Sequence, residues 1–118
     1  MKEMEAQEIM DGMAAKNRDL TAKNDELQRL YQVHAEAERI HNIQYAVKLV
    51  SLRMESTPIT LAKDLAKGDK IIAGLFYDVK IAEGVLNACR ERIKDLRSQI
   101  DTYRSLLSWL KSEKEITR

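Results

Sequence analysis

The stretch from Leu61 to Leu110 carries a hydrophobic repeat of seven residues. Every seventh residue from Leu65 to Leu107 is aliphatic, and the positions three residues further along are also apolar except at Gly68. These are the a and d positions of a coiled-coil helix, which supercoils to keep such a seam against its partner. The predicted seam comprises Leu65, Ile72, Leu75, Val79, Leu86, Cys89, Ile93, Leu96, Ile100, Leu107 and Leu110. The unbroken phase favours one continuous helix, and a break at Gly68, with glycine as a C-cap, is the alternative.

Residues 1–54 also read as one helix, but their apolar positions fall into two registers. The first runs through Met13, Leu20 and Leu27 and places Asn17 and Asn24 at core positions. Buried asparagines can fix the register of a coiled coil; the alternative is that both amides are solvated in a loosely packed segment. The second register is one residue out of phase and consists of Val33, Ile40, Ile43, Val47, Val50 and Met54. The phase step predicts a bend or a change of packing partner between the two registers.

The clearest break in the chain is Ser56-Thr57-Pro58. Threonine followed by proline suits a helix N-cap and first turn, and a short break favours antiparallel neighbours. The sequence therefore predicts a single elongated helical domain, residues 1–118, with helix one at about 2–55, a turn at about 56–59 and helix two at about 60–115. The predicted fold is all-α, a long antiparallel helical hairpin with coiled-coil character. Apolar residues beside the seam, such as Ile71, Phe76 and Val85, predict assembly into a multi-helix bundle, most simply as a homodimer.

The composition of the chain limits the partners and the cellular location that we expect. Charged residues make up 33% of the 118 residues, yet the net charge is +1, so no global field draws the chain to nucleic acid or an anionic membrane. The N-terminal region has no apolar core typical of a signal peptide, and no apolar run approaches the ~18 residues of a membrane span. We therefore expect a cytoplasmic protein without membrane contact. The one cysteine, Cys89, is expected to be a small buried apolar group; the alternative is a disulfide across a dimer.

Three residues of helix one share a helix face suited to metal binding. His34, Glu38 and His41 are spaced by four and three residues, and Glu38 with His41 gives the Glu-x-x-His motif of di-iron bundles. Such a site needs two of these motifs and two further glutamates, whereas helix two has no histidine. We therefore predict no metal and no cofactor, with both histidines on a half-buried face. Phosphate-binding loops and nucleophile motifs are also absent from the sequence, so we predict that the protein is not an enzyme.

Two features of helix two are candidate contacts for another macromolecule. Trp109 falls at an outside position beside leucines, and tryptophan is enriched among the residues that dominate protein interfaces; alternatively, it covers its own bundle. A basic stripe could bind phosphate groups and consists of Arg90, Lys94, Arg97 and Arg104. Acidic neighbours at spacings of three and four residues instead favour a solvated, self-paired face.

The C-terminal part of the chain resembles a group of known proteins. Residues 86–93, residues 97–100 and Leu106-Leu107 are similar to segments of small helical coiled-coil accessory proteins encoded by bacteriophages. The resemblance implies an accessory or inhibitory protein that binds a host or viral protein in the host cytoplasm. Together with the residue pattern, it leads us to expect a non-enzymatic, self-associating protein that works through protein–protein contacts. The alternative is a helical protein that binds nucleic acid through the basic stripe.

Overall fold

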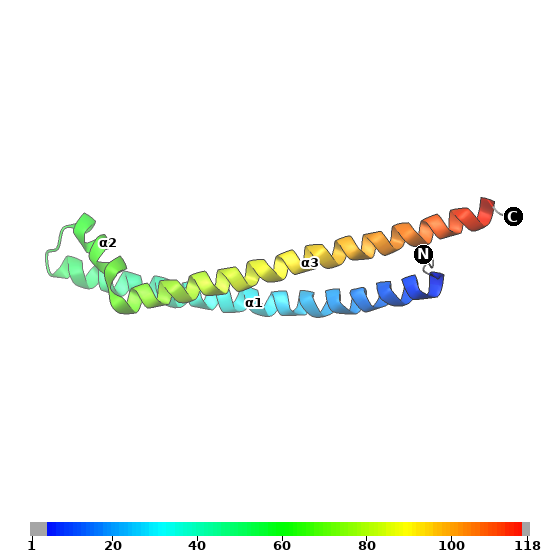
Figure 1. Cartoon of the computed structure of the whole chain (residues 1–118). Coiled ribbons are helices and arrows are strands. Elements are labelled where there is room, and N and C mark those ends of the chain that lie inside the picture. Colours follow the sequence, from blue (N-terminus) through cyan, green and yellow to red (C-terminus); the bar gives the residue numbers. More distant parts are fainter. Residues whose placement is uncertain (1–4, 117–118) are drawn as a thin grey trace. The chain divides into compact units, whose positions relative to one another are not determined.

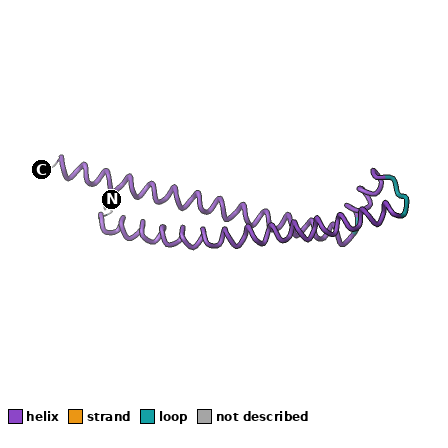
Figure 2. Tube along the Cα trace, turned by 180° about the vertical axis from the view of Figure 1, so that it is seen from behind, coloured by secondary structure: helices purple, strands orange, loops and turns teal. Residues whose placement is uncertain are grey.

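The computed structural model describes residues 5–116, which form three helices (Figure 1). α1 spans Ala6–Met54, α2 spans Ile59–Gly68 and α3 spans Lys70–Ile116. No strand occurs between residues 5 and 116, and short connections join the helices (Figure 2). α1 packs against α3, which runs in the opposite direction, so the all-α helical hairpin predicted from the sequence is confirmed.

The chain divides into two compact units. The terminal unit contains the described residues up to Leu27 and from Ala88 onward, and the central unit contains residues 28–87. Each unit therefore combines a stretch of α1 with a stretch of α3, and the central unit also holds α2.

The terminal unit has a narrow aliphatic core. It is formed by Ile9, Cys89, Ile93, Leu96 and Ile100, each at most 6% exposed. The Cys89 thiol donates a hydrogen bond of 3.6 Å to a backbone carbonyl oxygen of α1, at Lys23.

In the terminal unit, α1 makes a close contact with α3 at Gly12 and exposes two asparagine side chains. The Tyr103 ring lies over Gly12, where an added Cβ would come within 2.8 Å of the ring. Asn17 and Asn24 are exposed. The hypothesis that they fix the register from core positions is therefore wrong, and their solvated alternative is confirmed.

α1 ends in a Schellman motif rather than at a simple break. The Ser56 N–H donates to the Arg53 carbonyl oxygen at 3.0 Å, and the Thr57 N–H donates to the Leu52 carbonyl oxygen at 3.1 Å. Ser56 has φ 66°, the left-handed conformation that this motif requires at its C′ position and that glycine normally supplies. Thr57 therefore helps to end α1. It does not cap α2, which begins after Pro58 without a side-chain cap.

The predicted continuous helix two is wrong, because it is broken at Asp69. α2 ends at Gly68, Asp69 adopts an extended conformation, and α3 starts at Lys70. The Asp69 carboxylate oxygen Oδ1 accepts hydrogen bonds from the N–H groups of Ile71 at 3.0 Å and Ile72 at 3.2 Å. This is N-capping of a new helix, which satisfies amides that a continuous helix would bond to its preceding turn.

The break turns α2 so that different residues face α1. Ala62 and Ala66 are fully buried and form a small core with Leu52, whereas Leu61 and Leu65 are 51% and 47% exposed. Alanine has no bulky side chain, so the α2 backbone can approach α1 closely. Leu65 is thus not in the core, in contrast to its position in the predicted seam.

Farther along the predicted seam, most residues are covered within the chain. Those that are buried are Ile72, Val79, Leu86, Cys89, Ile93, Leu96 and Ile100. Leu75, Leu107 and Leu110 are half-buried.

Candidate protein-interaction surface

The exposed apolar side chains are concentrated in the central unit. Among the described residues, 18 large hydrophobic side chains are exposed; three lie in the terminal unit (Met10, Leu106 and Trp109) and the other fifteen lie in the central unit. Soluble monomers rarely expose large contiguous apolar patches, and such patches commonly mark binding surfaces. The central unit is therefore the candidate interaction surface.

One helix face supplies the most regular part of this surface. We call it the α1 outer stripe, and it consists of Val33, Ile40, Ile43, Val47, Val50 and Met54. Their side chains are 38% to 82% exposed. From Ile40 onward the spacing alternates between three and four residues, so these side chains follow one face of the helix.

From Ile40 to Met54, the α1 outer stripe faces away from α3 because another face of α1 makes that contact. The His41 ring lies 5.6 Å from the Phe76 ring of α3, and the Lys48 ammonium lies 3.8 Å from the Asp69 carboxylate. Toward the turn, Leu52 packs with α2. The residues of the second register from Ile40 to Met54 are therefore exposed, although their apolar spacing suits packing within the chain. α1 uses its more polar face within the chain and leaves its more apolar face open.

Charged groups are scarce along the α1 outer stripe. Between Ile40 and Met54 the sequence contains two charged residues, Lys48 and Arg53. Lys48 is turned toward Asp69, and Arg53 donates a 2.9 Å hydrogen bond to the Thr57 carbonyl oxygen. The cores of protein interfaces are depleted of charge in the same way, so the composition of this face suits contact with another chain.

One acidic side chain shares the helix face of the α1 outer stripe. Glu36 lies between Val33 and Ile40 and accepts hydrogen bonds from the Arg39 guanidinium at 2.9 and 2.5 Å. Hydrogen bonding to Arg39 lowers the pKa of the Glu36 carboxyl below its usual value, and the same pairing raises the pKa of Arg39. The carboxylate is thus compensated within its own helix.

A groove between α1 and α3 extends the apolar surface from Val33. The groove has a volume of about 360 Å³ and is lined by Leu30, Val33, Tyr77, Asp78, Ile81, Ala82 and Val85. Tyr77, Ile81 and Val85 are 65%, 51% and 46% exposed. Tyr77 and Ile81 were not predicted as contact residues, although apolar residues at outside heptad positions can indicate a second buried face.

A second groove lies around the histidine that faces α3. Its volume is about 640 Å³, and it is lined by His41, Asn42, Tyr45, Lys67, Ile72, Ala73 and Phe76. The His41 ring stacks on Tyr45 with a centroid separation of 6.2 Å. This groove is mainly apolar and aromatic, with Asn42 and Lys67 among its polar side chains.

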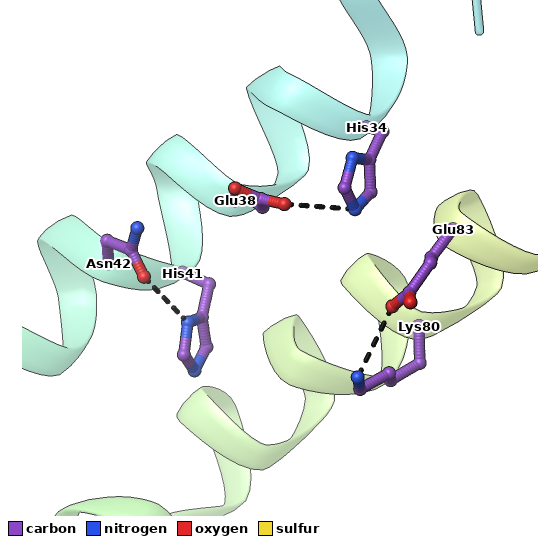
Figure 3. Close-up of polar contacts among 6 residues, drawn as sticks. All are labelled: His34, Glu38, His41, Asn42, Lys80 and Glu83. Atoms are coloured by element: carbon purple, nitrogen blue, oxygen red, sulfur yellow. Dashed lines mark hydrogen bonds and ion pairs between the residues drawn. The ribbon is translucent and has the colours of Figure 1, made fainter. Parts of the chain in front are cut away.

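The side chains of His34, Glu38 and His41 do not point toward a common position where a metal ion could bind. His34 Nε2 lies 3.0 Å from Glu38 Oε1, whereas His41 Nδ1 lies 3.2 Å from Asn42 Oδ1 (Figure 3). On the facing stretch of α3, Lys80 pairs with Glu83 at 3.2 Å (Figure 3). Within residues 5–116, no group of three His, Cys, Asp or Glu side chains is placed to hold a metal ion.

The predicted contact residues of helix two lie in the terminal unit. Trp109 is 55% exposed. The basic stripe residues Arg90, Lys94, Arg97 and Arg104 are all exposed. Two of them pair with acidic neighbours, since Lys94 lies 3.2 Å from Glu91 and Arg104 lies 3.4 Å from Asp101. Such pairing reduces the positive charge that the stripe can offer to phosphate groups.

Comparisons with known proteins add no assignment. No protein-family model, curated protein or solved structure matches the chain. The resemblance to bacteriophage-encoded helical proteins therefore stays a prediction. None of the described helices is long and apolar enough to span a membrane.

Proposed function

We propose that this protein is a non-enzymatic interaction protein that self-associates through the apolar surface of its central unit. The observation that carries the proposal is the placement of fifteen exposed large hydrophobic side chains in residues 28–87. Burying apolar surface contributes roughly 25 cal/mol per Å², so association would be favourable for a surface of this kind. Long packed helices with few convergent polar groups also suit a binding role better than catalysis.

A further protein partner is the second part of the proposal. We propose that such a partner, a host or viral protein if the chain is encoded by a bacteriophage, contacts Trp109 and the basic stripe of α3. The half-exposed indole of Trp109 supports this placement, because tryptophan is frequent among residues that dominate binding energy.

Nucleic-acid binding through the basic stripe is the competing function. It is less well supported because Lys94 and Arg104 already pair with acidic neighbours and because the net charge of the chain is +1. Binding to phosphates weakens steeply as salt rises, whereas apolar association does not.

The test is the mass of the purified protein in solution, measured before and after treatment with nuclease. We expect sedimentation equilibrium to give a dimer or larger species whose affinity changes little between low and high salt. A chain that stays monomeric at every concentration would contradict self-association. An assembly that disappears with nuclease or with added salt would favour nucleic-acid binding instead.

A further inference from the structure

We infer that the α1 outer stripe is the dimer contact and that it packs against the α1 outer stripe of a second copy of this chain. The inference rests on the proposed function and specifies the surface and the partner. The contact would join two central units through their α1 helices, with each α3 on the far side of its own α1.

The spacing of apolar residues in the stripe suits packing against a helix whose apolar residues have the same spacing. Ile40, Ile43, Val47, Val50 and Met54 follow the 3–4 alternation that lets side chains of one helix insert between those of another. Within the chain, α3 packs on a different face of α1, as the His41–Phe76 contact shows. A second copy presents the required pattern at the same five positions.

The chemistry of the stripe favours a partner of the same kind. Five of its six positions are isoleucine or valine, which have few rotamers and lose little side-chain entropy on packing. The lack of outward charge between Ile40 and Met54, apart from Arg53, gives an acidic or basic partner little to recognise. Two identical apolar faces instead complement each other without leaving a charge buried and unpaired.

The accessible surface of the chain is large enough for this contact. The chain exposes 8823 Å², whereas a folded monomer of 13.6 kDa is expected to expose about 6,600 Å². A standard interface buries about 800 Å² on each partner. The excess over the expected area is therefore larger than the share that one partner buries in a contact of standard size.

Single cysteines test whether the two stripes meet. The background is Cys89→Ser, which keeps a hydroxyl donor for the Lys23 carbonyl oxygen. Ile43→Cys and Val47→Cys are then made separately, with Asn42→Cys as the control because it neighbours Ile43 but lies about 100° around the helix. Each protein is oxidised alone, and the Ile43→Cys and Val47→Cys proteins are also oxidised as a mixture.

We expect an interchain disulfide at the stripe positions and little at Asn42→Cys. A disulfide requires Cα atoms within about 7 Å. Rapid cross-linking of both variants, each with itself, would show a parallel contact, whereas self-cross-linking of only one variant, or cross-linking only in the mixture, would show an antiparallel one. Either result supports the inference, whereas cross-linking no faster than that of the Asn42→Cys control in all three samples overturns it.

A charge substitution provides an independent measurement. Val47→Asp should weaken dimerisation by about a hundredfold, because two valine side chains lose their burial and two carboxylates enter the contact. Asn42→Asp adds the same charge off the stripe and should leave the dimer intact. If the natural chain dimerises but Val47→Asp has no effect, this inference fails while the proposed function stands; a monomeric natural chain would remove the proposed function itself.

Discussion

At the scale of single residues, Ser56 adopts a backbone conformation that its residue type does not predict. Its φ of 66° places it in the left-handed region, which costs a residue with a Cβ roughly 1–2 kcal/mol. Glycine, the usual sign of a helix end, is absent at this turn, and Thr57-Pro58 predicts a helix start instead. Hydrogen bonds from Ser56 and Thr57 to the last turn of α1 hold the conformation.

Ser56→Gly should therefore stabilise the protein by about 1 kcal/mol, since glycine adopts this conformation without the steric cost. The matched control is Ser51→Gly in the body of α1, which should destabilise the protein by about 0.5 kcal/mol. Chemical denaturation of the two variants measures both changes. Changes of the same sign would contradict the role assigned to Ser56.

At the scale of helices, the break at Asp69 explains why the heptad repeat predicted one part of α2 incorrectly. The repeat places Leu61 and Leu65 in the seam, whereas α2 buries Ala62 and Ala66. A heptad count records which positions are apolar but does not include the stability that an N-cap adds to a new helix. From Ile72 to Ile100 no break occurs, and the positions that the repeat places on the inner face are buried or half-buried.

Asp69→Ala should lower the stability of the protein by about 1 kcal/mol, because the N–H groups of Ile71 and Ile72 lose their acceptor. Asp69→Asn should be close to neutral, since asparagine caps helices as well as aspartate does. It also removes the charge that faces Lys48, which as a surface pair contributes little. Hydrogen exchange at Ile71 and Ile72 should quicken in the alanine variant. Equal stability of the two variants would contradict the cap.

At the scale of the whole molecule, the sequence predicts the architecture better than it predicts the faces of α1. The long heptad repeat and the short turn are sufficient for an all-α antiparallel hairpin. α1, however, has an aliphatic face at Ile43 and Val47 and a face with His34, His41 and Tyr45. A rule that buries the more apolar face selects the first, yet α3 packs on the second. The physical reason is that α1 carries apolar groups on two faces, and α3 covers only one of them.

The position of Trp109 makes its fluorescence a probe of one of the two units. It is the single tryptophan of the chain and belongs to the terminal unit, whereas all six residues of the α1 outer stripe belong to the central unit. Its fluorescence therefore reports on unfolding of the terminal unit, while far-ultraviolet circular dichroism averages the helices of both units. Coincident transitions would show that the two units unfold as one cooperative structure. Separate transitions would show that each unit has its own stability, and natural tryptophan emission would distinguish them without any added label.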